Sequence, residues 1–307
     1  MSYTNLTSEF NYKDLVFWQN MDALAENDKF IRELYALYRR PNLVFVSVTE
    51  VDVESNIGTP NETRIIFNDN EVRTVFEDTT LTSKYRRFNI TETADFSVST
   101  ENSGLRDGLS ESGNAWYAIY AVKSQLDTTK FVLVGDDDLP LLANITALDA
   151  RYGEKGWLYL GLIRNGDRDT GGGDILDFIQ SGEKTLLNNV FDSESIGIKF
   201  LDALATGTQT WAYVSGTGSL QIPGNIAIAI WQCKLIGENG DFLQINDSSG
   251  AKSYHAGIAF GSNNHFAQVF MPATEGVQIV SRAATSPKAS LWGWVDNVMG
   301  LGFNPRF

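Results

Sequence analysis

The chain has 307 residues, of which 43% are hydrophobic and 12% are aromatic. This composition is typical of a folded globular protein and excludes an intrinsically disordered one. The 24 basic and 38 acidic residues give a formal net charge of −14, which repels phosphate backbones and anionic lipid headgroups. We therefore expect neither nucleic acid nor a membrane among the partners of this protein.

The first 41 residues are expected to form a short helical arm. Between Asn27 and Arg40, apolar side chains recur at spacings of three and four, which indicates one amphipathic helix. Pro41 ends this helix because proline has no backbone N–H to donate. The segment from Phe10 to Leu24 is also too apolar for a free tail. We expect the arm to dock to another protein through Phe17, Trp18, Phe30, Ile31, Leu34 and Tyr38.

From residue 42 onward, hydrophobicity alternates with a period of two, and Gly, Asn, Asp and Ser clusters separate the apolar runs. This pattern predicts a mainly β protein with two antiparallel, jelly-roll-like β-sandwich domains. The first covers residues 42–185 and the second covers residues 186–307, with the boundary in a polar, Asn-rich segment. The expected elements include strands at 115–123, 130–135, 156–164 and 225–236 and a helical turn at 146–152.

One expected strand, from Ile226 to Cys233, is apolar on both faces. A half-exposed strand would alternate with polar residues. Either both faces pack inside the domain, or one face meets another subunit. A trimer without a coiled coil must be held by such sandwich faces, because stable interfaces are more apolar than ordinary surface. The candidate interface residues are Ala227, Ala229, Trp231, Phe266 and Phe270.

Few residues suit catalysis or targeting. His255 and His265, the two histidines of the chain, lie in expected strands without a partner motif. The segment from Gly216 to Ser219 lacks the strand-to-helix context of a serine nucleophile. Residues 1–10 lack a signal-peptide pattern, and the single Cys233 cannot form an internal disulfide. We expect no enzyme activity, no cofactor and synthesis in a reducing cytoplasm.

Two acidic stretches could hold a cation through oxygen ligands, which calcium prefers. The first is Asp136-Asp137-Asp138, and the second runs from Asp167 to Asp174 through three glycines. The second departs from the EF-hand pattern because Phe178 stands where a bidentate Glu belongs. A solvated hairpin tip is the alternative interpretation. The weak calcium candidates are Asp167, Asp169 and Asp174.

An ordered series of motifs runs through the middle of the chain. The motifs are Tyr85-Arg86-Arg87-Phe88, Gly104-Leu105-Arg106-Asp107-Gly108, Trp116-Tyr117, Gly161-Leu162-Ile163-Arg164 and Asp177-Phe178-Ile179-Gln180. In this order and spacing, residues 84–182 resemble a module of tail-fibre, spike and other surface proteins of tailed bacteriophages. The closing part, with Trp292-Gly293-Trp294, is similar to the region downstream of this module in that family. Arg106 replaces the Asp that the family usually has in its Gly-Leu-Asp-Thr-Gly turn.

The resemblance implies a structural component of a tailed-phage virion. This would be a short surface spike or fibre, or a capsid decoration protein, that docks by its N-terminal arm and contacts the host surface. We expect a homotrimer that is made in the host bacterial cytoplasm and carried in the virion, with capsid or tail proteins and a host glycan as partners. The alternative is a carbohydrate-binding receptor protein or a glycan hydrolase of a phage tail, because Trp and Tyr side chains stack on sugar rings.

Overall fold

The computed structural model describes the part of the chain that forms the β body. The described residues are 41–54, 63–67, 72–74, 87–96, 101–113, 115–127, 129–154, 156–166, 173–188, 198–201, 207–211, 213–214, 222–235, 242–247, 252–258, 265–272, 277–282 and 288–296. The expected N-terminal arm lies outside these residues.

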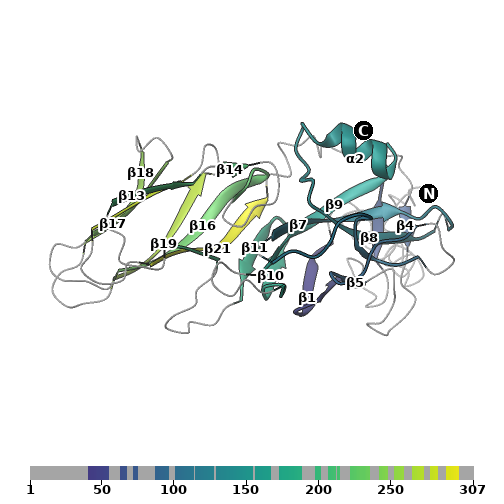
Figure 1. Ribbon diagram of the computed structural model, residues 1–307, viewed down its shortest axis with the longest axis horizontal. Helices are drawn as coiled ribbons and strands as arrows, with labels where there is room; N and C mark the ends of the chain where they lie inside the picture. The colour runs from purple at the N-terminus through teal and green to yellow at the C-terminus, as the bar shows by residue number, and fades with distance from the viewer. Residues whose placement is uncertain are drawn as a thin grey trace, which may run out of the picture.

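The prediction of a mainly β protein is confirmed, because strands make up nearly all the regular structure of the described residues (Figure 1). The first half contains β1 (Leu43–Ser47), β2 (Glu50–Val53), β3 (Arg64–Ile66), β4 (Val72–Thr74), β5 (Arg87–Asn89), β6 (Gly104–Leu105), β7 (Ala115–Lys123), β8 (Phe131–Asp136), α2 (Ile145–Tyr152), β9 (Trp157–Asn165), β10 (Phe178–Ser181) and β11 (Lys184–Leu187). The second half contains β12 (Ile198–Leu201), β13 (Gly207–Trp211), β14 (Tyr213–Val214), β15 (Ile222–Pro223), β16 (Ile226–Leu235), β17 (Phe242–Asp247), β18 (Ser253–Ile258), β19 (His265–Pro272), β20 (Val277–Arg282) and β21 (Lys288–Asp296).

A nine-stranded antiparallel sheet runs through both halves of the chain. Its order is β19-β16-β21-β11-β10-β1-β2-β5, and β12 also pairs with β21. The expected domain boundary between residues 185 and 186 falls inside β11, and β11 pairs with β21 from the other side of that boundary. Hydrogen bonding therefore continues across the boundary that the sequence pattern suggested.

A second sheet, in the order β6-β8-β7-β9, packs against the first to form a sandwich. Trp116 of β7 meets Trp294 of β21 edge to face, with ring centroids 5.1 Å apart. Gly161 of β9 lies so close to β10 that a Cβ atom there would be 2.7 Å from Nε2 of Gln180. The Gln180 side chain joins the two sheets, because Nε2 donates to the Leu160 carbonyl at 3.1 Å and Oε1 accepts from Leu43 N at 2.5 Å.

The strand at the centre of this second sheet, β7, is buried along almost its whole length. Its Tyr120 packs against Trp157 and Tyr159 of β9 and against Tyr152 of α2. The helix is held to β9 by a hydrogen bond from Trp157 Nε1 to the Asp149 carboxylate. In Figure 1, α2 and β1 lie on opposite sides of β7 and β8. No described helix is long and apolar enough to cross a bilayer.

The C-terminal half adds a four-stranded antiparallel sheet in the order β13-β20-β17-β18. Figure 1 shows β13, β17 and β18 at the end of the molecule beyond β16 and β19, opposite the end that carries α2. Two short pairs, β3 with β4 and β14 with β15, complete the described strands.

The apolar strand β16 lies between β19 and β21, so neighbours cover both of its edges. Ala229 and Trp231 are fully buried within the single chain. This burial favours the alternative in which both faces of the strand pack inside the chain, and the subunit interface itself stays a prediction. Ala227 is partly buried, and Phe270 of β19 is exposed. The side chain of Phe266 is outside the described part of the structure.

The close approach of β11 and β21 gives a stability prediction. A Cβ atom on Gly293 would lie 2.4 Å from the Thr185 carbonyl oxygen, which is fixed in the ladder. We expect Gly293→Ala to lower the free energy of unfolding by about 1 to 3 kcal/mol, as overpacking does. Urea denaturation followed by circular dichroism measures this. The control is Lys184→Ala, an exposed residue on β11, and equal stability of the two variants would contradict the expected clash.

Candidate functional site

The densest group of charges in the described structure lies where β8 ends. Asp136, Asp137 and Asp138 follow one another, and one ligand oxygen from each lies within 4.8 Å of the others. Asp136 is fully buried, whereas Asp137 and Asp138 are partly exposed. Three carboxylates this close require compensating positive charge, from a cation or from basic side chains.

Arginines from two sides provide that charge. Arg106, which follows β6, bonds through Nε to Asp136 at 3.1 Å and through NH2 to Asp137 at 2.6 Å. Arg151, in the last turn of α2, bonds to Asp138 at 2.9 Å and also contacts Asp136. The two guanidinium groups therefore bridge all three carboxylates.

The remaining acceptor positions of Asp136 are also used. Tyr152 donates its hydroxyl to Oδ2 at 2.5 Å, and the backbone N–H of Asp138 donates to Oδ1 at 2.9 Å. A carboxylate has about four lone-pair sites, and Asp136 accepts from Arg106, Arg151, Tyr152 and Asp138. The three acids that were considered as a cation site therefore form an ion-pair network. This network joins α2 and the turn that carries Arg106 to the end of β8.

The network shifts the pKa values of its members. Burial alone would raise the pKa of Asp137, but the hydrogen bond and charge of Arg106 outweigh burial and lower it. Burial, followed by the neighbouring Asp136 carboxylate, raises the pKa of the Tyr152 hydroxyl. The pKa of Arg151 is also raised, because its bonds to Asp138 and its proximity to Asp136 exceed the opposing effect of burial. At neutral pH, Asp137 and Arg151 are therefore charged and Tyr152 is a neutral donor.

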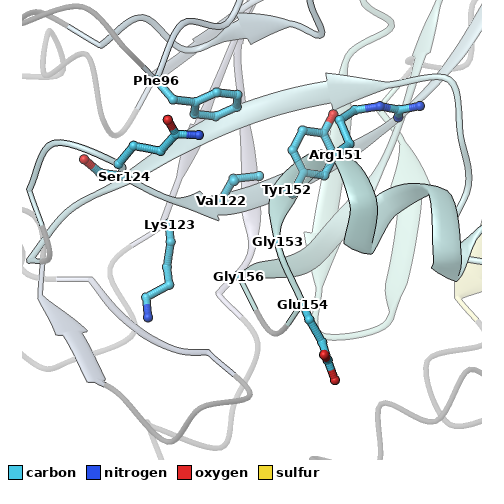
Figure 2. A pocket seen from close by; sticks show the side chains of 10 residues that line it. Phe96, Val122, Lys123, Ser124, Arg151, Tyr152, Gly153, Glu154 and Gly156 are labelled. Atoms are coloured by element: carbon cyan, nitrogen blue, oxygen red, sulfur yellow. The ribbon is translucent and has the colours of Figure 1, made fainter.

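Next to the network is a pocket of about 320 Å³ that shares Arg151 and Tyr152 with it. Phe96 and Tyr152 meet edge to face in this pocket, with ring centroids 6.2 Å apart. Figure 2 shows the Arg151 guanidinium directed away from Phe96 and Ser124. The pocket is lined by Phe96, Val122, Lys123, Ser124, Gln125, Arg151, Tyr152, Gly153, Glu154 and Gly156.

The pocket hydroxyl, that of Ser124, has a structural role. Its oxygen accepts from the backbone N–H of Asp127 at 2.8 Å and of Leu126 at 3.1 Å, which fixes the turn between β7 and β8. The hydroxyl donates to the buried carboxylate of Glu101 at 2.5 Å. These bonds occupy the lone pairs that a nucleophile needs. The Ser124 hydroxyl is therefore engaged in holding the turn between β7 and β8.

Of the three calcium candidates, Asp174 alone lies among the described residues. Asp174 is exposed, and its carbonyl accepts from Gly166 N at 2.7 Å. Asp167 and Asp169 lie outside the described residues, so calcium binding there stays a prediction. The histidines occupy strands as expected, with His255 in β18 and His265 in β19. The docking residues of the arm are outside the described part of the chain and also stay predictions: Phe17, Trp18, Phe30, Ile31, Leu34 and Tyr38.

Sequence reasoning missed the partners of the acidic cluster. The sequence marked Arg106 only as a departure from a family motif, and it gave no role to Arg151 or Tyr152. In the structure, the guanidinium group of Arg106 neutralises Asp136 and Asp137. The sequence did contain one signal for a partner of the acids, because Arg151 falls in the last turn of the helix expected at 146–152.

Comparison with known proteins assigns no family to the chain. No family model matches it, and no curated protein sequence matches it. A solved structure of infectious bursal disease virus, Gt strain, aligns with a TM-score of 0.14 and 11% sequence identity, over 84% of this chain and 65% of the viral chain. The chain thus spans less than two thirds of that viral protein, and a TM-score this low does not indicate a shared fold.

The ion-pair network predicts a pH-dependent stability. We expect Arg106→Gln to lower the free energy of unfolding at pH 7 by about 2 kcal/mol, because a buried carboxylate loses a charged hydrogen-bond partner. Folding lowers the pKa of the Asp137 carboxyl group. Such a group contributes stability above its unfolded pKa of about 4, and this contribution disappears as the pH falls through its folded pKa. Thermal unfolding between pH 7 and pH 2.5 should therefore show that the melting temperatures of the wild type and of Arg106→Gln converge at acid pH.

The control for this series is Lys130→Gln, which removes an exposed ion pair with Asp127. Exposed pairs contribute about 0 to 1 kcal/mol, so this variant should resemble the wild type at every pH. A loss in Arg106→Gln that is no larger than in the control, or that does not change with pH, would show that the network does not stabilise the fold.

Proposed function

We propose that the chain is a non-enzymatic structural protein of a virus particle, and within that class a short surface spike, fibre or decoration protein of a tailed bacteriophage. The motif series of residues 84–182, which resembles the surface-protein module of that group, supports the proposal. The fold is compatible with it, because a mainly β sandwich is a suitable building block for an exposed particle protein.

One observation carries the proposal: three of the motif residues, Phe88, Gly161 and Gln180, lie where the two sheets of the sandwich meet. Phe88 of β5 lies against Gly135 of β8, where a Cβ atom would be 2.8 Å from its ring. Gly161 of β9 lies beneath Gln180 of β10, which bonds to backbone in both sheets. The resemblance thus rests in part on residues that hold the two sheets together.

Arg106 supports the same interpretation. It is the point at which the chain departs from the family turn, and Asp136 and Asp137 compensate its charge. The departure does not argue against the proposed resemblance, because Arg106 has partners within the fold. Within the proposed function, this network stiffens the end of the sandwich that carries α2.

In the proposed assembly, the N-terminal segment docks to a capsid or tail protein, with Phe17 and Trp18 as the main contacts. The sandwich body projects and contacts the host surface. The protein is a homotrimer, is made in the host bacterial cytoplasm and is located in the virion. It uses neither nucleic acid nor a membrane as partner, since its net charge of −14 opposes both.

Deletion of residues 1–40 tests the docking role. We expect the truncated protein to remain folded, because the described sandwich begins at residue 41, and to be absent from purified particles. Incorporation is measured by mass spectrometry of particles from cells that make either form. A conservative control, Trp18→Phe in the full chain, should incorporate normally. Normal incorporation of the truncated protein would contradict the docking proposal.

The pocket favours a second candidate, a carbohydrate-binding protein of a phage tail. The aromatic rings of Phe96 and Tyr152 beside the exposed polar side chain of Gln125 give a combination that suits a sugar ring. A screen against host polysaccharides should show binding that weakens about tenfold or more in Phe96→Ala, a loss of about 1.4 kcal/mol. Leu142→Ala, an exposed residue outside the pocket, is the control.

The same screen separates binding from hydrolysis. Binding without cleavage is the result expected for an adsorption protein. Released oligosaccharide, detected by chromatography, would overturn the non-enzymatic assignment and favour the glycan hydrolase. Equal binding by the two alanine variants would exclude the pocket as the carbohydrate site.

A further inference from the structure

The nine-stranded sheet carries a row of apolar residues that crosses six of its strands. Residues directly opposite one another in antiparallel strands point to the same face. The row can therefore be followed through the register from β19 to β1, where it consists of Phe270, Ile230, Gly293, Leu186, Ile179 and Val44. This set of six residues is the apolar row.

The apolar row faces away from the core of the sandwich. Its neighbours along the strands, including Trp294 and Leu187, point to the opposite face and are buried. In the apolar row, by contrast, Phe270 is 56% exposed, Ile179 is 59% exposed and Val44 is 41% exposed, although Ile230 in the middle is buried. Three of the large exposed apolar side chains of the described structure thus lie in one line across the sheet.

A second line on the same face extends the apolar surface. It passes from Pro272 through Ile228 and Val295 to Lys184. Exposed polar residues bound the surface, with Gln268 on one side and Ser181 on the other. Within the apolar row, Leu186 fills the space above Gly293, where a Cβ atom would lie 2.7 Å from its Cδ2. The exposed apolar surface therefore lies at the two ends of the apolar row, at Phe270 and at Ile179 and Val44, with the buried Ile230 between them. A polar margin beside such a surface is typical of one that another element covers.

The size of the patch decides between occupants. Five steps between strands of about 4.8 Å make it about 24 Å wide, and two lines two residues apart span about 7 Å along the strands. This area of roughly 170 Å² is small beside the roughly 800 Å² per partner of a stable interface between two proteins. It is comparable to the footprint of a helix of fourteen residues, which is about 21 Å long and about 10 Å across.

The described chain begins at residue 41, and the segment just before it is the candidate for such a helix. The segment expected to be an amphipathic helix, residues 27–40, is followed after Pro41 and Asn42 by β1, which carries Val44. Asn42 is fixed at the sheet, because its side chain bonds to Glu54 at 2.8 Å and accepts from Gly182 N at 2.8 Å. Helix-to-strand connections of two to six residues are the common length in packed units.

We propose that residues 27–40 pack on the apolar row of their own chain, with the stripe of Phe30, Ile31, Leu34, Leu37 and Tyr38 facing Val44 and Ile179. The two-residue connection favours this intramolecular contact, because a short linker gives a high effective concentration. The contact goes beyond the proposed function, since it divides the arm into two parts. The stripe covers the sheet, and the preceding segment with Phe17 and Trp18 remains for a neighbouring protein.

A disulfide-trapping experiment on the full chain tests this contact. Leu34→Cys combined with Ile179→Cys should form an intrachain bond under mild oxidation, seen as an oxidised monomer whose bond peptide mapping places between the two introduced thiols. Arg32→Cys combined with Ile179→Cys is the matched control, because residue 32 lies on the opposite side of the expected helix. Equal trapping in both pairs, no trapping in the first pair, or disulfide-linked dimers would each overturn the proposal, the last in favour of a second copy.

A labelling measurement provides an independent readout. In a full chain carrying only Ile179→Cys, the introduced thiol should react with a maleimide slowly, and about tenfold faster when Leu34→Asp is added, since this charge displaces the stripe. Arg32→Asp should leave the rate unchanged. Peptide mapping distinguishes this thiol from Cys233. Labelling at the same rate in all three proteins would show that the stripe does not cover Ile179.

Discussion

The pairing of β11 with β21 is the constraint on which the rest of the structure depends. Three residue pairs, with Leu186 opposite Gly293 at one end, join strands that are about a hundred residues apart in the chain. The absence of a side chain at Gly293 lets the Thr185 carbonyl approach, and Leu186 occupies the space that remains. Beside it, Trp294 reaches the second sheet and meets Trp116. One short ladder thus joins the two halves of the chain and both layers of the sandwich.

This arrangement gives the sandwich two different outer faces. One is the apolar row on the nine-stranded sheet, next to the start of the described chain. The other, on the side of α2, carries the ion-pair network and the pocket (Figures 1 and 2). The first face suits a packed protein segment, and the second suits a polar ligand.

The sequence predicted local structure well where a single strand or helix is sufficient to produce the pattern. The strand expected at 115–123 is β7, the strands expected at 130–135, 156–164 and 225–236 differ from β8, β9 and β16 by about one residue at each end, and the helix expected at 146–152 is α2. These elements carry strong hydrophobic patterns, and their type does not depend on distant residues.

Pairing and charge compensation could not be predicted in this way. Nothing in the alternation of residues 184–187 indicates that the partner is β21, because register is decided by packing in three dimensions. In the same way, Asp136 to Asp138 suggested a cation because the pattern of three acids is visible in the sequence. The arginines that neutralise them come from residues 106 and 151, on other elements of the fold. The burial of Trp231 also depends on strands that are distant in sequence.

Differential scanning calorimetry of the full chain tests the central claim most directly. If the ladder between β11 and β21 joins the two halves into one sandwich, the chain should unfold in a single transition whose calorimetric and van't Hoff enthalpies agree. Two separate transitions, with one assigned by limited proteolysis to residues 42–185 and the other to residues 186–307, would contradict the account.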